Sequence, residues 1–177
     1  MTHEFLIAGF GGQGLLFAGK FLVNKGMMDG KEVSWLPSYG PEMRGGTANC
    51  SVIISDEPVG SPIVSKPNVL MVMNLPSLDK YENEVKAGGK IFVDSSLIGR
   101  KVERTDVDVY YVPATQLASD NGLSGLANMI LIGKLMKELG EFEDESAVAE
   151  SLKKVVSVKH PEMFDFNLKA LKMGRDY

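Results

Sequence analysis

Short apolar runs and longer helical segments alternate along the chain. Phe5–Phe10 is a continuous apolar run that ends in glycines, which is typical of a buried strand. Leu15–Met28 repeats apolar residues at helical spacing, and Asp29-Gly30 ends this helix as a turn. The same pattern predicts strands at Glu32–Leu36, Thr47–Ser55, Val69–Met73, Lys90–Asp94 and Val107–Val112, and helices at Pro76–Lys86, Leu123–Leu139, Glu145–Val156 and Pro161–Met173.

The segment Thr47–Ser55 is different, because its residues alternate so that one face of the strand would be fully apolar. Strands that alternate with helices favour a parallel sheet. The sequence therefore predicts a Rossmann-like α/β fold with three layers, in which a mostly parallel sheet carries helices on both faces. Thr47–Ser55 would be its antiparallel or edge member. With 177 residues and no internal repeat or linker, we expect a single domain over residues 1–177.

Composition narrows the classes of function. The chain has 19 Lys and Arg against 23 Asp and Glu, a net charge of −4, and no basic run, which argues against binding to nucleic acid or anionic membranes. Its longest apolar runs fall far short of the roughly 20 residues of a membrane span. No signal peptide is visible at the N-terminus, so we expect a cytoplasmic protein.

A single cysteine excludes a disulfide framework, a four-thiolate iron–sulfur cluster and a cysteine-based zinc site. His3 and His160 are the only histidines, and we expect both at the surface, so the sequence predicts no metal site. Cys50 falls on the apolar face of its strand, which favours a buried, unreactive thiol.

A glycine loop joins the first strand to the first helix. Gly9-Phe10-Gly11-Gly12-Gln13-Gly14 satisfies the pattern G-x-G-x-x-G in the position where that pattern binds phosphates. A dinucleotide site also expects an acidic residue at the end of the second strand, but Glu32 stands at its start. NAD binding is therefore disfavoured. A phosphate-bearing ligand and a purely structural loop remain as alternatives.

A second unusual loop, Ser38–Thr47, follows the second strand and would lie at the same sheet edge as the glycine loop. Arg44 is followed by two glycines, so its guanidinium could clamp a carboxylate or phosphate bidentately. The alternatives are an ordinary surface pair between Glu42 and Arg44, and packing of Tyr39 over the sheet edge.

Other polar residues stand where a partner is needed. Asn128 lies within an apolar helix and needs a hydrogen-bond partner, either in the core or across an interface. Ser95-Ser96 follow a strand and would either point to the ligand edge or cap a helix. Candidate caps for the helix Leu123–Leu139 are Asp120, Asn121 and Ser124.

Together the two loops resemble the gamma subunit, or gamma domain, of 2-oxoacid:ferredoxin oxidoreductases. The resemblance rests on Gly9–Gly14 and on the run Ser38–Cys50, which contains Tyr-Gly-Pro-Glu-Met-Arg-Gly-Gly-Thr. Asp56–Pro62, Asn128-Met129 and a terminal helix with Asn167–Ala170 extend it over essentially the whole chain. The form of the second loop looks more like the 2-oxoglutarate and branched-chain branches than the pyruvate branch. We rank 2-oxoglutarate first, and indolepyruvate oxidoreductases contain a related domain.

The resemblance implies one subunit of an enzyme that decarboxylates a 2-oxoacid oxidatively, forms acyl-coenzyme A and reduces ferredoxin. It implies alpha, beta and delta-type partner subunits that hold thiamine diphosphate, magnesium and the iron–sulfur clusters. This chain would bind no cofactor by itself, would contact coenzyme A and the 2-oxoacid, and would be inactive alone. The alternative is a free-standing Rossmann-type nucleotide-binding protein.

The resemblance implies that the chain covers the active site and supplies an anion-binding edge, with no catalytic group of its own. Arg44 and Glu42 are the candidates for active-site contact. The residues expected to contact the ligand are Gly9, Gly11, Gly12, Gln13, Gly14, Ser38, Tyr39, Arg44, Gly45, Gly46, Thr47 and Asn128.

Overall fold

A single sheet forms the centre of the protein. The computed structural model describes residues 1–38 and 48–177, and within them six strands follow the order β2-β3-β1-β4-β5-β6. The strands are β1 (Thr2–Gly9), β2 (Glu32–Ser38), β3 (Ala48–Ser55), β4 (Val69–Val72), β5 (Lys90–Asp94) and β6 (Asp108–Val112). The helices are α1 (Leu15–Met28), α2 (Leu75–Tyr81), the short 3₁₀ helix η2 (Glu82–Glu84), α3 (Ala114–Asp120), α4 (Ala127–Leu139), α5 (Glu145–Val155) and α6 (Glu162–Asp176).

Every strand except β3 runs in the same direction. β1 pairs in parallel with β4, β4 with β5, and β5 with β6, whereas β3 is antiparallel to both β1 and β2. This confirms the predicted mostly parallel α/β sheet and the antiparallel strand at Ala48–Ser55. The alternative of an edge position for that strand is wrong, because β2 and β6 are the outer strands. We call the edge where the five co-directional strands end the carboxyl edge, and the opposite one the amino edge.

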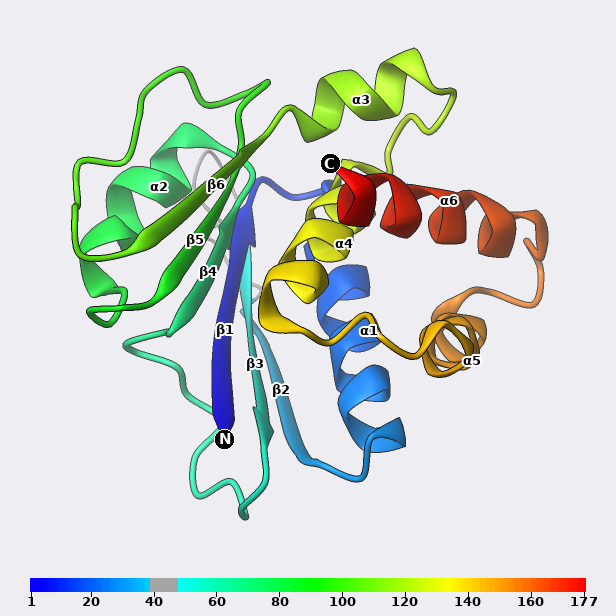
Figure 1. Ribbon diagram of the computed structural model, residues 1–177, viewed down its shortest axis with the longest axis horizontal. Coiled ribbons are helices and arrows are strands. Elements are labelled where there is room, and N and C mark those ends of the chain that lie inside the picture. Colours follow the sequence, from blue (N-terminus) through cyan, green and yellow to red (C-terminus); the bar gives the residue numbers. More distant parts are fainter. Residues whose placement is uncertain (39–47) are drawn as a thin grey trace.

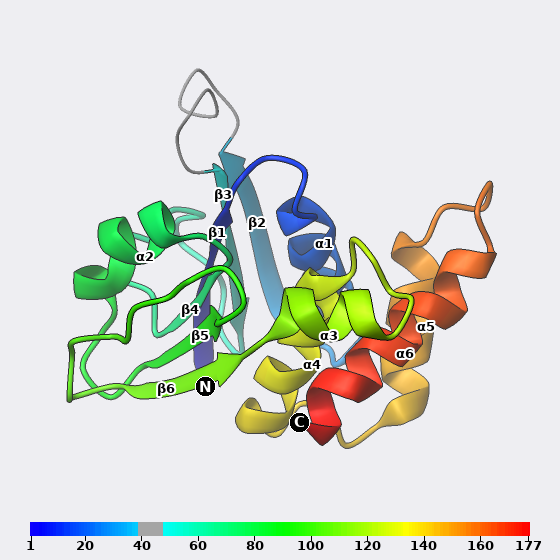
Figure 2. The same cartoon turned by 90° about the horizontal axis from the view of Figure 1, so that it is seen from above.

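Helices cover both faces of the sheet, as the sequence predicted. α2 and η2 pack on one face, and α1 and α4 on the other (Figure 1). On β1 and β4, Leu6 and Leu70 belong to the α2 side, whereas Ile7 and Met71 belong to the α1 side. α5 packs on α1 and α6 on α4, farther from the sheet (Figure 2). No helix in residues 1–38 and 48–177 is sufficiently long and apolar to span a bilayer.

Two predicted helices have different bounds in the structure. The helix expected at Leu123–Leu139 begins only at Ala127, because Gly125 adopts a φ of +84° that breaks the helical path. Neither Asn121 nor Ser124 caps it, and the N-cap residue Leu126 receives no side-chain bond. Asp120 instead ends α3, a short helix that the pattern did not predict. α2 stops at Tyr81, and η2 replaces the rest of the predicted Pro76–Lys86 helix.

β2 is longer than the predicted strand Glu32–Leu36. It continues through Pro37 to Ser38, which pairs with Asn49 of β3. An outer strand tolerates proline because one side of its backbone needs no ladder partner. The rest of the predicted loop Ser38–Thr47, from residue 39, lies outside the described residues.

His3 is not a surface residue. Its side chain is only 14% exposed, lies 5.7 Å from the ring of Phe5, and is 3.6 Å from a carboxylate oxygen of Glu141. Burial is the main reason that the pKa of His3 is lowered, and Glu141 opposes that effect. His160 is exposed, as predicted.

Candidate functional site

The glycine loop lies at the carboxyl edge of the central strand. Gly9 ends β1 and pairs with Ala48, the first described residue of β3. Helices after β1 and β4 leave on opposite faces of the sheet, so the crevice between these strands is a switch point where open α/β sheets bind ligands. The loop therefore stands where a ligand of this architecture is expected.

Gln13 fixes the loop across that crevice. Its side-chain oxygen accepts a hydrogen bond from the Phe10 amide at 2.7 Å, and its side-chain nitrogen donates to the Met73 carbonyl at 3.0 Å. One side chain thus closes the loop on itself and ties it to the end of β4. The side chain of Gln13 therefore has a structural role, and the ligand contact predicted at Gln13 stays a prediction.

Asn128 holds the other end of the loop. This 2% exposed side chain donates from its nitrogen to the Gly14 carbonyl at 2.9 Å, whereas its buried Oδ1 has no hydrogen-bond partner among the described residues. A Cβ at Gly14 would collide with that nitrogen, and the residue has a φ of +75°. Both the available space and the backbone conformation therefore require glycine. Asn128 therefore supports the loop through its hydrogen bond to the Gly14 carbonyl.

The start of α1 is open toward a cavity. Gly14 is its N-cap without any side-chain cap, so the amides of Leu15, Leu16 and Phe17 have no intrahelical acceptor. A cavity of about 270 Å³ lies against this turn and is lined by Phe10, Gly11, Gly12, Gly14, Leu15, Leu16, Phe17, Ser38, Ala48 and Asn49. Backbone amides at a helix N-terminus favour a negatively charged guest.

The two ends of the second loop reach the same cavity. Ser38 and Asn49 form a pair of the β2–β3 ladder, and both line the cavity beside the glycine loop. The proximity of the two loops at one sheet edge is thus confirmed for the residues that flank the second one. Tyr39, Glu42, Arg44, Gly45, Gly46 and Thr47 lie outside the described residues.

A second cavity, of about 340 Å³, lies on the β4–β5 side of the glycine loop. Gly12 and Gln13 line it together with hydroxyl-bearing residues of the α3 region, among them Thr115 and Ser119. Thr115 did not stand out in the sequence, since α3 itself was not predicted. Ser96 caps α3 by accepting from the Gln116 amide at 3.0 Å, so the capping alternative for Ser95-Ser96 holds at Ser96.

Asp94 is the buried acidic residue at this edge. It is 0% exposed and accepts from the Thr115 hydroxyl at 2.6 Å, from the Ser96 amide at 3.1 Å and from the Thr115 amide at 3.4 Å. Three donors satisfy the carboxylate, which therefore positions the start of α3.

The described residues offer no ligand set for an iron–sulfur cluster or a metal ion. Cys50 is 0% exposed, and burial raises the pKa of its thiol to about 12, which favours the protonated form over the thiolate that binds metals. In the part of the chain that the structure describes, no three His, Cys, Asp or Glu side chains gather as a metal site. What this edge offers chemically is an array of backbone donors.

The chain matches known proteins over nearly its full length. Residues 4–177 match the family model described as pyruvate ferredoxin/flavodoxin oxidoreductase. The 2-oxoglutarate synthase subunit KorC of Methanocaldococcus jannaschii is 37% identical over 166 residues, which cover 90% of this chain and 89% of that protein. The ketoisovalerate oxidoreductase subunit VorA of Methanothermobacter marburgensis is 38% identical over 171 residues. This match covers 97% of this chain but only 35% of VorA, so the chain spans about a third of that relative.

Solved structures agree with the fold. The gamma subunit of a keto/oxoacid ferredoxin oxidoreductase from Geobacter sulfurreducens has a TM-score of 0.82 at 28% identity, covering 98% of this chain and 96% of its own. The 2-oxoglutarate:ferredoxin oxidoreductase of Magnetococcus marinus has a TM-score of 0.85 at 23% identity, covering 99% of this chain and 30% of that one. With this agreement in sequence and fold, the chain belongs to the pyruvate ferredoxin/flavodoxin oxidoreductase family.

Proposed function

We propose that this chain is the gamma-type subunit or domain of a 2-oxoacid:ferredoxin oxidoreductase that forms acyl-coenzyme A from 2-oxoglutarate or a branched-chain 2-oxoacid. Alpha, beta and delta-type partners would hold magnesium, the iron–sulfur clusters and thiamine diphosphate, which would supply the chemistry of decarboxylation. Ferredoxin would receive the electrons through the complex. 2-Oxoglutarate ranks first because the KorC relative is matched over 89% of its length, although the identities of 37% and 38% do not separate the two branches.

The observation that carries this proposal is the open glycine loop. Gln13 and Asn128 fix its two ends, while Gly12 keeps a φ of +87° with no heavy atom within 4 Å of where a Cβ would be. The uncapped first turn of α1 faces the neighbouring cavity. The phosphate-bearing arm of coenzyme A is the ligand of this reaction that such backbone donors would bind.

The second loop would complete the anion site. Its flanking residues Ser38 and Asn49 line the cavity at the start of α1. Arg44 would hold a carboxylate or phosphate bidentately, and Glu42, Tyr39 and Thr47 would shape the loop or contact the partner subunit. In this role the chain binds, orients and covers, and it transfers no proton or electron.

The test compares two glycines in the assembled complex. Gly12→Ala introduces strain at a φ of +87° without a steric clash, and Gly30→Ala introduces the same kind of strain at a φ of +72° far from the loop. We expect Gly12→Ala to raise the apparent KM for coenzyme A about tenfold or more, with little change in the KM for the 2-oxoacid. Gly30→Ala should leave both unchanged.

Arg44→Ala tests the role of the second loop independently in the same complex. We expect the KM for coenzyme A or the KM for the 2-oxoacid to rise. The constant that rises identifies the anion that the guanidinium binds. If neither Gly12→Ala nor Arg44→Ala alters a kinetic constant, this edge does not bind a ligand. If the purified chain has no thiamine diphosphate-dependent partner, the proposed function itself is wrong.

A further inference from the structure

A third cavity is lined by the starts of α1 and α4 and by the connection from α5 into α6. It measures about 310 Å³, and its wall includes Gly14, Phe17, Asn128 and Asn167. None of the described residues in this wall is Lys, Arg, Asp or Glu. Cavities of this size, mostly apolar and with a few polar groups, are typical of small-molecule sites.

Two buried asparagine side chains in this wall use only half of their hydrogen-bonding capacity. Asn128 and Asn167 are each 2% exposed. Asn128 donates to the Gly14 carbonyl at 2.9 Å, and Asn167 donates to the Met163 carbonyl at 2.8 Å. Because a carbonyl can only accept, the side-chain nitrogens must face these partners, and the two Oδ1 atoms take the opposite positions. Both Oδ1 atoms are buried and have no donor among the described residues.

A buried oxygen without a donor is uncommon in folded proteins and costs free energy. Asn24 and Asn121 also donate to a carbonyl four residues earlier in their helices, but they do so at exposed positions where water reaches the remaining oxygen. Asn167 makes the same local bond in a buried position. Two such oxygens on residues that line one cavity indicate a guest that supplies hydrogen-bond donors.

The remainder of the wall indicates the chemistry of that guest. Ser157 and His160 are exposed and line the cavity, and apolar side chains make up most of the rest, namely Phe17, Leu126, Val155, Val156 and Met163. A charged ammonium group would enter this wall without a carboxylate to pair with, which is costly. An uncharged head is therefore favoured. A primary carboxamide carries two N–H donors on one nitrogen, whereas a hydroxyl carries one.

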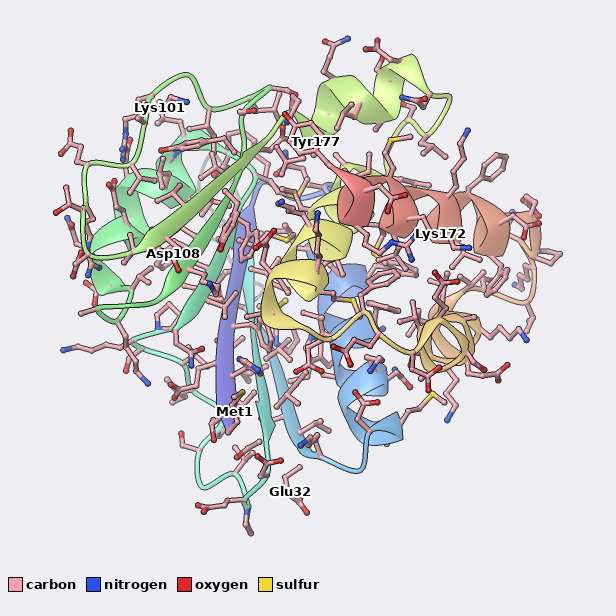
Figure 3. All side chains as sticks on the ribbon, viewed as in Figure 1. Met1, Glu32, Lys101, Asp108, Lys172 and Tyr177 are labelled. Atoms are coloured by element: carbon pink, nitrogen blue, oxygen red, sulfur yellow. The ribbon has the colours of Figure 1, made fainter. Side chains whose placement is uncertain are left out.

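Contacts outside the cavity hold its walls in place. Lys172 of α6, which Figure 3 labels, pairs with Glu145 at the start of α5 at 3.8 Å, and Arg175 pairs with the same carboxylate. α4 and α6 touch so closely that a Cβ at Gly133 would collide with the Leu171 carbonyl. The helices that form the walls are thus fixed to one another independently of any guest.

We propose that this cavity is a binding site for an uncharged small molecule with an apolar body and a primary carboxamide head, whose N–H groups donate to Oδ1 of Asn128 and of Asn167. The site goes beyond the proposed function, because it requires neither a partner subunit nor coenzyme A. It also differs in chemistry from the glycine loop, where backbone amides favour an anion. Asn128 connects the two places, since its nitrogen holds the Gly14 carbonyl.

The experiment titrates the purified full chain with benzamide and follows the side-chain amide signals of Asn128 and Asn167 by NMR. Benzoate, which is charged, and N,N-dimethylbenzamide, which has no N–H donor, are the matched compounds. We expect benzamide to shift both signals and to bind at least about tenfold more tightly than either matched compound. Equal affinities of the three compounds, or no shift with benzamide, would overturn the inference.

A pair of variants tests the acceptor itself. Asn167→Leu removes one oxygen and keeps an apolar wall, so we expect benzamide to bind at least about tenfold more weakly. Asn24→Leu removes the same kind of local bond outside the cavity and should leave the affinity unchanged. Unchanged binding to Asn167→Leu counts against the site. Should Asn167→Leu fail to fold, the comparison of the three compounds on the wild-type chain decides.

Two further measurements separate this site from its neighbours. Excess coenzyme A should not displace benzamide; displacement would make the cavity a continuation of the proposed coenzyme A site and overturn the inference of a separate one. Benzamide should also bind the assembled complex. Loss of binding there would show that another polypeptide fills the cavity, which overturns the inference as well. The proposed function is tested by the kinetics of the complex, so the two proposals can fail separately.

Discussion

The two edges of the sheet are held together by different forces. At the carboxyl edge the contacts are mostly hydrogen bonds of amides and hydroxyls, from Gln13 to Phe10 and Met73, and from Asn128 to Gly14. At the amino edge the contacts are ion pairs, such as Lys90 with Asp108 at 3.0 Å. Neutral hydrogen bonds keep their geometry when water is excluded, whereas unpaired charges would be costly there. The two edges should therefore respond differently to substitution and to salt.

Removal of the buried acceptor at the carboxyl edge should have the largest effect. Asp94→Ala would leave the Thr115 hydroxyl and two backbone amides without an acceptor in a water-excluded place, and we expect a loss of about 3 kcal/mol in the free energy of unfolding. Asp94→Asn retains an acceptor and should cost clearly less. Urea denaturation measures the free energy of unfolding of both variants. Equal losses would show that the hydrogen bonds to Asp94 do not account for its contribution to stability.

Loss of the two side-chain hydrogen bonds of Gln13 should have a smaller and more local effect. Gln13→Ala should cost about 1–2 kcal/mol, because two hydrogen bonds are lost at a partly buried site. Hydrogen exchange at the Phe10 amide should become faster. The matched control is Asn24→Ala, which removes an exposed amide bond to the Lys20 carbonyl and should leave stability nearly unchanged. Fast hydrogen exchange of the Phe10 amide in the wild-type chain would contradict the hydrogen bond from this amide to Gln13.

At the amino edge a single ion pair should contribute less. Lys25→Met keeps the aliphatic stem of a 6% exposed side chain and removes its pair with Asp29, so we expect a change within about 1 kcal/mol. That change should shrink further in high salt, unlike the effect of Gln13→Ala. Lys153→Met, which removes an exposed pair with Glu150, serves as the surface reference. A salt-independent loss of several kcal/mol would show that the two edges are not held differently.

The smallest expected effect is a pH dependence at Asp56. The ammonium groups of Lys31 and the N-terminus lower the pKa of Asp56 from 3.8 to about 2. A lowered pKa in the folded state adds stability above pH 3.8, and this contribution disappears as the pH falls toward 2. Asp56→Asn should therefore flatten the pH dependence of the unfolding midpoint in that acidic range. Glu57→Gln at the next position is the control, and a flattening there as well would remove Asp56 as the cause.

Much of the fold could be predicted from local patterns. The glycines after β1 and the apolar run before them placed the loop, and the alternation in Ala48–Ser55 gave its antiparallel strand. These signals are local because a strand or a turn depends on residues close in sequence. The start of α4 was missed because the positive φ of Gly125 is not visible in the hydrophobic pattern.

The contacts that hold the candidate site could not be predicted in the same way. Gln13 bonds to Met73, 60 positions away, and Asn128 bonds to Gly14, 114 positions away. The sequence marked Gln13 as a ligand contact and Asn128 as a polar residue in an apolar helix, but their partners depend on the strand order. His3 was misplaced for a similar reason, since it is Glu141 and the far end of α4 that cover it.

The antiparallel direction of β3 brings two distant ends of strands together. Ser38 at the end of β2 pairs with Asn49, and Ala48 at the start of β3 pairs with Gly9, so both residues lie at one edge of the sheet. A parallel strand in this place would require the connection to travel the length of the sheet. Because the two ladders hold Ser38 and Ala48 by their own pairings, the register of the described framework is set independently of the sequence that joins these two residues.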